Sequence, residues 1–212
     1  NKVVIMGQAR NDVLHEPNQS LVKKLLNKPS SCKNILYAPT WRTFCETKLF
    51  PFECVDFFQL SNFLEENNIN IFLRLHPNFK ASIPKEISNI ARVTTLFSSE
   101  IAEINDILGA FDLLITDYSS IYIDYLVTLK PILFLPYDYE EFKEEIGFTI
   151  SYKEYAPGPK PKTQAEFESE LHKLLFNRHY YKEERISANN ILNYLERSNC
   201  EQNADFILKK MK

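Results

Sequence analysis

The stretch FDLLITDYSSIYIDYLVTLKPILFLPY, residues 111–137, decides the fold of this chain. Its apolar run 112–116 predicts a strand that is buried on both faces. After the polar residues DYSS, apolar side chains at helical spacing predict a helix over 121–129. Pro131 ends that helix, and 132–135 form a second apolar strand. Strand, helix and strand in succession predict a βαβ unit and therefore a parallel sheet.

The DYSS turn, residues 117–120, follows the first of these strands and precedes the helix. Ligands of open α/β sheets bind at the carboxyl ends of the strands, close to the starts of helices. The two hydroxyls and the first free N–H groups of the helix would suit a phosphate. The simpler interpretation is that Ser119 and Ser120 only cap the helix, and that Asp117 caps the loop.

Composition limits the class of protein. The chain has 212 residues, 44% of them hydrophobic, so we expect one domain over residues 1–212, with C-terminal helices from about residue 178. The net charge of −3 gives no electrostatic reason to expect nucleic-acid binding. Four scattered cysteines without CxxC indicate reduced, cytosolic thiols, and we expect neither a metal nor a cofactor. The absence of GxGxxG and GxxxxGK[ST] excludes the dehydrogenase and P-loop types of nucleotide site.

The remaining sequence alternates between strands and helices, which predicts an α/β fold: a Rossmann-like, doubly wound parallel sheet followed by C-terminal helices. A helical turn is expected at 84–89, and Thr163 is expected to cap the helix that follows it. Further strands are expected at Lys2–Met6, Asn34–Ala38, Ile69–Leu75 and Val93–Leu96, and helices at Gln19–Leu26, Val55–Asn67, Glu100–Leu108, Gln164–Phe176, Lys182–Glu196 and Gln202–Met211.

The chain begins at Asn1 without a methionine, in sequence that is already strand-like. We therefore expect it to be a piece of a longer protein. It contains no signal peptide, and no apolar run approaches the roughly 18 residues that a membrane-spanning helix needs.

Polar side chains follow three of the predicted parallel strands, in the turns TWR (40–42), HPN (76–78) and DYSS (117–120). If those strands are neighbours, the turns converge on one edge of the sheet. Arg42, His76 and the two serines would then supply a bidentate cation, an imidazole and two hydroxyls for a pyrophosphate. Taken singly, the histidine is more often structural, and a Trp-Arg pair is usually packing plus a surface charge.

Asp124 lies four residues after Ser120, among apolar and aromatic neighbours. A carboxylate in such a place is costly to bury unless a donor reaches it. The hydroxyls of a bound ribose could be that donor, and so could a nearby arginine or lysine. The residues leave both alternatives open.

Six stretches together resemble the C-terminal domain of the CDP-glycerol glycerophosphotransferase family, which polymerises the polyol phosphates of teichoic acids and capsules. The resemblance runs from about Gly7 to Leu175, and the combination is specific although each motif alone is weak. The stretches are GQARND at 7–12, YAPTWR at 37–42, RLHP at 74–77, TDYSSIYIDY at 116–125, KPILFLPYDYEEF at 130–142 and YAPGP at 155–159.

This resemblance implies a GT-B fold, of which the chain is the C-terminal half that binds the nucleotide-activated donor. The acceptor and a His-Gly-Thr motif with a catalytic base belong to an N-terminal domain that is absent from this chain. By resemblance, His76 is the catalytic residue, as a phosphate ligand or charge stabiliser. The serines match the pyrophosphate turn, Asp124 contacts ribose or polyol, and Arg10 and Asn11 lie near the interdomain cleft. The candidate site residues are Arg10, Asn11, Thr40, Trp41, Arg42, His76, Pro77, Asp117, Ser119, Ser120 and Asp124.

The chain departs from the family pattern in three places. Ala9 replaces a proline, Ile146-Gly147-Phe148 replaces Arg-Gly-Phe, and Ile150-Ser151-Tyr152 replaces Phe-Asp-Tyr. The last two changes remove a cation and a carboxylate where the donor could be recognised. CDP-ribitol or another activated polyol therefore stays open beside CDP-glycerol.

The leading hypothesis is the donor-binding domain of a transferase that moves polyol phosphate from a CDP-activated polyol to a polymer or lipid-linked acceptor and releases CMP. We expect the full-length enzyme to be cytoplasmic and peripheral at the inner face of the plasma membrane, and this piece alone to be inactive. Only the lysines of the C-terminal helix hint at membrane contact. The alternatives are a GT-B glycosyltransferase or sugar-nucleotide epimerase that uses a UDP-sugar, and a degenerate non-catalytic nucleotide-binding module.

Overall fold

A five-stranded parallel sheet forms the centre of the computed structural model, which describes residues 3–26, 31–77, 83–194 and 198–211. The strand order is β3-β2-β1-β4-β5, and every neighbouring pair is parallel. The chain starts in the middle of the sheet, winds to one edge and then to the other, so the doubly wound, Rossmann-like prediction is confirmed. The strands are β1 (Lys33–Tyr37), β2 (Ile69–Leu73), β3 (Val93–Thr95), β4 (Leu113–Thr116) and β5 (Ile132–Phe134).

Two hydrophobic cores lie on opposite faces of this sheet because successive strand residues point to opposite sides. Leu36 and Leu114 belong to one core, whereas their neighbours Ile35 and Ile115 belong to the other. All four are fully buried. Both faces therefore need cover, which explains the continuous apolar runs in the strand sequences.

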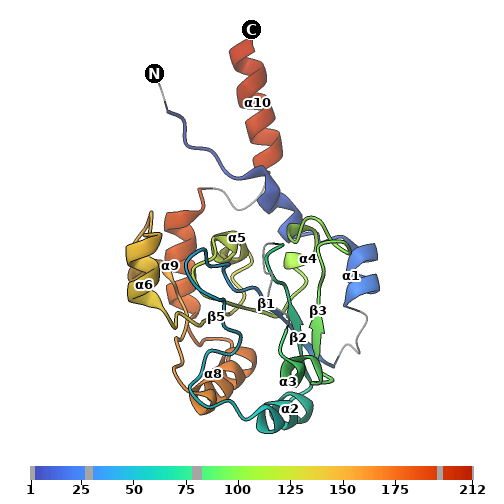
Figure 1. The fold of residues 1–212 in the computed structure, drawn as a ribbon. Helices are drawn as coiled ribbons and strands as arrows, with labels where there is room; N and C mark the ends of the chain where they lie inside the picture. Colours follow the sequence, from blue (N-terminus) through green and yellow to red (C-terminus); the bar gives the residue numbers. More distant parts are fainter. Residues whose placement is uncertain (1–2, 27–30, 78–82, 195–197, 212) are drawn as a thin grey trace.

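Helices supply that cover on both faces (Figure 1). The core around Leu36 is closed by α1 (Gln19–Leu25), α4 (Asn105–Leu108), α5 (Ile121–Leu126) and α9 (Lys182–Leu192). The other core is closed by α2 (Phe57–Glu66), α3 (Lys85–Ser88) and α8 (Gln164–Phe176). The remaining elements are the 3-10 helix η1 (Ala9–Leu14), α6 (Tyr139–Glu145), α7 (Tyr152–Tyr155) and α10 (Asn199–Met211).

Local sequence signals predicted several helix ends well. The Thr163 hydroxyl accepts a hydrogen bond from the Glu166 N–H at 3.2 Å, which caps α8 as expected. The turn predicted at 84–89 is helix α3. Both signals act within a few residues, so they can be read without knowing the rest of the structure.

The start of α10 depends instead on a residue far away in the sequence. The Asp12 carboxylate accepts N–H bonds from Asn199 at 2.9 Å and Cys200 at 2.8 Å. The helix therefore begins at Asn199, three residues before the predicted start at Gln202. From this cap α10 projects away from the sheet, and the N-terminal segment leaves the body on the same side (Figure 1).

Three predicted elements differ from the structure. The strand expected at Lys2–Met6 is wrong for its described residues, since Val3 and Ile5 are 92% and 72% exposed and no neighbouring strand pairs with them. The helix expected from Glu100 begins only at Asn105, because the Arg74 guanidinium holds the Ile101 carbonyl at 2.8 Å. Helix α9 ends at Leu192, before the predicted end at Glu196, which lies outside the described residues.

Gly109, at the end of α4, allows η1 to lie directly against that helix. A Cβ atom added there would come within 1.8 Å of the Leu14 carbonyl oxygen. That oxygen belongs to the backbone, so it cannot swing aside as a flexible side chain could. The contact therefore fixes η1, the segment that carries Arg10 and Asn11, on the body of the domain.

Gly109→Ala is expected to destabilise the protein by at least about 2 kcal/mol, because the methyl group overpacks a backbone contact. Gly147→Ala is the matched control. Gly147 has φ +81° and ample space around its Cβ position, so the same substitution costs about 1 kcal/mol of backbone strain. Urea unfolding of both variants measures the difference. Equal losses of stability would show that η1 does not depend on this contact.

Candidate functional site

Three turns meet at the carboxyl edge of the sheet, because β2, β1 and β4 are neighbours. Trp41, after β1, stacks on His76, after β2, with ring centroids 5.6 Å apart. Thr40, also after β1, donates its backbone N–H to Asp117, after β4, at 2.8 Å. The predicted convergence of the turns is therefore confirmed. Asn78, the last residue of the second turn, lies outside the described residues.

Arg42 lies at the centre of this edge, and it is only 3% exposed. Its guanidinium donates to both oxygens of Asp138, at 2.9 Å and 2.8 Å, and also to Asp117 and the Thr40 carbonyl. Burial by itself lowers the pKa of Arg42, but Asp138 and Asp117 raise it overall. The side chain therefore stays charged and joins the turn after β1 to those after β4 and β5.

Arg42 was expected to bind a diphosphate, but these contacts occupy most of its donors. Four of its five N–H groups are already donated within the protein. Rings of Tyr118, Tyr137 and Phe142 lie within 5.6 Å of the guanidinium and close it off from solvent. Arg42 thus positions the turns around it and does not itself present a free fork to a ligand.

Asp117 and Thr40, like Arg42, use their polar groups for contacts within the protein. Asp117 is 2% exposed, and its Oδ1 accepts from the Thr40 N–H, the Thr40 hydroxyl and the Tyr118 N–H. Its Oδ2 accepts from Arg42. This geometry supports the alternative that Asp117 caps its own loop, because both of its oxygens accept hydrogen bonds from the protein.

The two serines remain available to a ligand. Ser120 takes the N-cap position of α5, yet its side chain makes no capping hydrogen bond, and it is exposed. The Ser119 hydroxyl accepts only a long bond of 3.4 Å from the Ile121 N–H. Both serines line a cavity of about 400 Å³. The Arg42–Asp117 pair therefore holds rigidly a turn whose two serine hydroxyls donate no hydrogen bond to the described residues.

Asp124 finds its donor within the chain. The Arg10 guanidinium binds it with two hydrogen bonds of 3.0 Å and 3.2 Å. The Asp124 side chain is 6% exposed, whereas that of Arg10 is 56% exposed. The nearby arginine is thus the partner that the structure shows, in the absence of any ligand.

Asn11 helps to place this pair. It is 1% exposed, and its amide donates to the Asn193 side chain at 3.4 Å. Asn193 in turn donates to the Ile123 carbonyl of α5 at 2.9 Å. Asn11 is therefore a buried link between η1 and α5, next to the arginine that contacts Asp124.

His76 and Pro77 lie on the exposed rim of the same edge. The imidazole is held from one side by the Trp41 ring, which is itself 37% exposed. An exposed imidazole fixed on an aromatic ring can reach a group bound outside the sheet edge.

Sequence reasoning missed Asp138. This residue lies within the stretch KPILFLPYDYEEF, and no binding or structural role was expected for it. It nevertheless follows β5 at the same edge of the sheet as the other turns. Its side chain is 6% exposed and forms two of the bonds to Arg42. An acidic residue just past a buried strand was the available signal.

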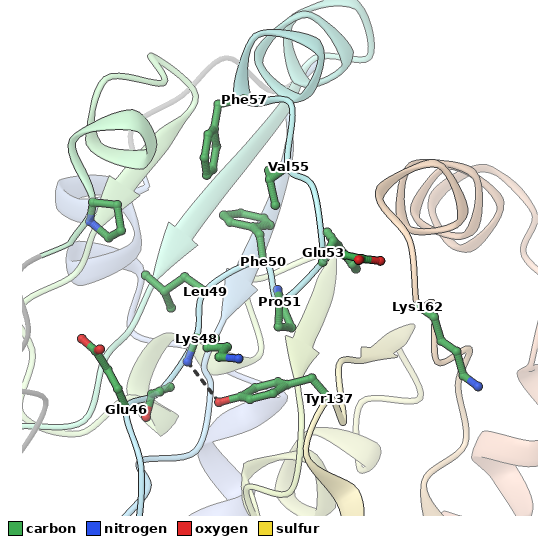
Figure 2. Close-up of a pocket in the computed structure, with 13 residues that line it drawn as sticks. Glu46, Lys48, Leu49, Phe50, Pro51, Glu53, Val55, Phe57, Tyr137 and Lys162 are labelled. Atoms are coloured by element: carbon green, nitrogen blue, oxygen red, sulfur yellow. Dashed lines mark hydrogen bonds between the residues drawn. The ribbon is translucent and has the colours of Figure 1, made fainter.

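A second hollow, of about 780 Å³, lies beside the loop before α2 (Figure 2). Phe50 and Val55 give it apolar walls, and the Lys48 N–H donates to the Tyr137 hydroxyl at 3.0 Å. Burial raises the pKa of Tyr137 to about 12. The Tyr137 ring also packs against Arg42, and no candidate site residue lines this hollow. It is therefore separate from the serine turn.

The described ranges offer neither a cluster of metal ligands nor a membrane-spanning helix. Across residues 3–26, 31–77, 83–194 and 198–211, no group of three or more His, Cys, Asp and Glu side chains is arranged to hold a metal ion. None of the helices in those ranges is long and apolar enough to cross a membrane.

The chain is similar to proteins of known function. Residues 1–208 match the family described as CDP-Glycerol:Poly(glycerophosphate) glycerophosphotransferase. A teichoic acid poly(glycerol phosphate) polymerase of Bacillus subtilis is 35% identical over 175 residues, which are 78% of this chain and 23% of that protein. The teichoic acid ribitol-phosphate polymerase TarL of Staphylococcus aureus is 33% identical over 162 residues, 74% of this chain and 28% of that protein.

Among solved structures, the wall teichoic acid polymerase TagF matches with a TM-score of 0.74 and 27% identity. The match covers 98% of this chain and 52% of that one. The chain thus spans between about a quarter and a half of the length of these proteins.

Arg42→Met is expected to lower the free energy of unfolding by about 3–5 kcal/mol, because it leaves two buried carboxylates without their cation. Arg178→Met is the control, since Arg178 is exposed and a surface change of this kind costs within about 0.5 kcal/mol. Urea unfolding followed by circular dichroism compares the two. A loss in the Arg42 variant as small as the control's would contradict the structural role of this arginine.

Proposed function

The chain belongs to the CDP-glycerol:poly(glycerophosphate) glycerophosphotransferase family, and we propose that it is the donor-binding domain of a polyol-phosphate transferase. The donor is a CDP-activated polyol, glycerol or ribitol, and the acceptor is a hydroxyl of a cell-surface polymer or of a lipid-linked chain. The names of the relatives support this choice, because they include both a glycerol-phosphate and a ribitol-phosphate polymerase.

One observation carries the proposal: Ser119 and Ser120 line a cavity, while buried ion pairs beneath them hold their turn in place. Arg42, Asp117 and Asp138 hold the backbone of the turn through buried ion pairs. A preorganised turn whose hydroxyls can still donate hydrogen bonds can bind the oxygens of a diphosphate without first having to rearrange. Asp124 lies on the helix that follows, and Arg10 of η1 binds it there.

In the reaction that we propose, an acceptor hydroxyl attacks the β-phosphorus of the CDP-polyol. A new P–O bond forms between the acceptor oxygen and the β-phosphorus, the bond between the β-phosphorus and the bridging oxygen breaks, and CMP leaves with that oxygen. The acceptor proton passes to a base. Little covalent work falls to the protein, so positioning and charge stabilisation dominate.

His76 is the residue of this chain that we assign to the chemical step. It lies on the exposed rim and is held by Trp41, at the edge where the serine turn also lies. A neutral imidazole there donates an N–H to a phosphate oxygen, and a protonated one adds positive charge or protonates the leaving group.

The bound Arg10–Asp124 pair fits a second part of the proposal. If the ribose or polyol hydroxyls take over the Asp124 carboxylate, the Arg10 guanidinium is released beside a doubly charged diphosphate. In that exchange the Asp124 carboxylate accepts hydrogen bonds from the hydroxyls, and the Arg10 guanidinium pairs with the diphosphate, so both groups keep hydrogen-bond partners.

The acceptor half of the cleft lies, in our proposal, in an N-terminal domain outside this chain. The relatives are about two to four times as long as the segment that matches them. The full-length protein would act peripherally at the inner face of the plasma membrane, where a nucleotide-activated donor and a lipid-linked acceptor can meet. The 212 residues alone would bind the donor without transferring it.

Calorimetric titration with CDP, CDP-glycerol, CDP-ribitol and a UDP-sugar tests the binding proposal. Cytidine nucleotides are expected to bind, and a Ser119→Ala, Ser120→Ala double variant is expected to bind them at least about tenfold more weakly, from the loss of hydrogen bonds to a charged group. Ser187→Ala, on the exposed side of α9, is the control. Preference for the UDP-sugar would favour a glycosyltransferase or epimerase. A folded protein that binds none of these nucleotides would refute the proposal.

His76→Ala in the full-length protein is expected to lower turnover by at least about 10²-fold, the low end for a positioned acid–base group. His179→Ala, an exposed histidine after α8, should leave turnover unchanged. Release of CMP from the CDP-polyol is the quantity to follow. Near-normal turnover after His76→Ala would remove this residue from the mechanism.

A further inference from the structure

The cavity beside the serine turn continues beneath the loop between α6 and α7. It holds about 400 Å³, and its walls include Ser119, Ser120, Ile146, Ile150 and Tyr152. No Asp, Glu, Lys or Arg of the described residues lines it. Desolvating a charged group in such a place would be costly, so the cavity suits an uncharged group attached to whatever the serines hold.

An aromatic cluster contributes to the wall of this cavity. Tyr118, Phe142, Phe148 and Tyr152 line it, and Tyr139 packs against Phe148 and Tyr152. Their rings face one another: Phe148 stacks on Tyr139 at 5.4 Å and on Phe142 and Tyr152 at 5.5 Å each. Ring faces that are used in this way are not free to sandwich a flat nucleobase. The cluster offers ring edges and hydroxyls instead.

Two of those hydroxyls, on Tyr118 and Tyr152, are buried and make no hydrogen bond within the described residues. Tyr152 as a whole is only 4% exposed. A buried hydroxyl without a partner costs free energy, so its persistence in a cavity wall needs an explanation. A ligand hydroxyl would satisfy it.

The charge state of the cluster suits the same kind of ligand. Burial, followed by the negative charge of Asp117, raises the pKa of Tyr152 well above its usual value. Burial, followed by the nearby Asp138 carboxylate, also raises the pKa of Tyr118. Both phenols therefore keep their protons at neutral pH and can donate hydrogen bonds.

We propose that this cavity binds the uncharged polyol end of the donor, with the Tyr152 hydroxyl hydrogen-bonded to a polyol hydroxyl while the attached phosphate rests on Ser119 and Ser120. The inference rests on the proposed function and adds to it the place where the transferred group is recognised. It also gives a role to the segment from Ile146 to Tyr152, where the chain departs from the family pattern. With isoleucine at 146 and 150, the cavity would recognise the polyol by its hydroxyls and its shape and not by charge.

Tyr152→Phe removes the oxygen and keeps the ring. In calorimetric titrations it is expected to weaken binding of the preferred CDP-polyol by about threefold to tenfold, the value of one neutral hydrogen bond, and to leave the affinity for CDP unchanged. Tyr155→Phe, three residues later in α7 and outside the cavity, is the matched control. Ile150→Trp, which fills the cavity, should weaken CDP-polyol binding more strongly and again spare CDP.

Thermal unfolding without ligand gives an independent readout. If the Tyr152 hydroxyl has no partner in the protein, Tyr152→Phe should keep or raise Tm, whereas loss of a structural hydrogen bond would lower it. Equal CDP-polyol affinity in wild type and both cavity variants would overturn the proposal while the donor function stands. Equal losses for CDP and CDP-polyol would overturn it too, because the cavity would then hold the nucleotide. If wild type binds no cytidine nucleotide at all, the proposed function itself fails.

Discussion

The buried ion pairs of Arg42 with Asp117 and Asp138 are the interaction on which the site depends. A parallel sheet brings the carboxyl ends of its strands to one edge, but it does not fix the turns that follow them. Here one guanidinium binds the turn after β1, the turn after β4 and the segment after β5 at once. Removing three charged groups from water is costly, and the arrangement is stable only because the hydrogen bonds of all three are satisfied together. In return the serine turn is held in one conformation.

This arrangement separates positioning from binding. Three charged residues at the edge are buried and paired with one another, so their charges serve the fold. They are Arg42, Asp117 and Asp138. The residues of the site that keep exposed or partly exposed side chains are smaller or lie on the rim: Ser119, Ser120, His76 and Arg10. For transfer of a phosphoryl group, where the protein mainly positions the reactants, a rigid base under a modest set of contacts is a physically reasonable design. The uncharged cavity behind the serines extends it towards the transferred group.

The two ends of the chain are organised by distant contacts of the same kind. Gly109 lets η1 approach α4, Asp12 caps α10, and Asn193 ties η1 to α5. Together these contacts hold Arg10 over Asp124. From that point α10 projects beyond the sheet and presents Ile207, Leu208 and Met211, each more than half exposed. The side of the domain that carries the candidate site is therefore also the side from which both chain ends depart.

The sequence by itself determined the layout of the domain. Apolar runs that alternate with helices predict a doubly wound parallel sheet, and local capping and turn residues predict several helix ends. It also placed the polar turns at one edge, because that follows from strand direction alone. Only the tertiary structure decided what each polar residue does there. Whether Arg42 faces a ligand or two carboxylates, and whether Asp124 meets a ribose or Arg10, depends on residues up to 114 positions away. Residue type and spacing carry no information on such contacts, since charge pairing and burial are set by which segments the folded chain brings together.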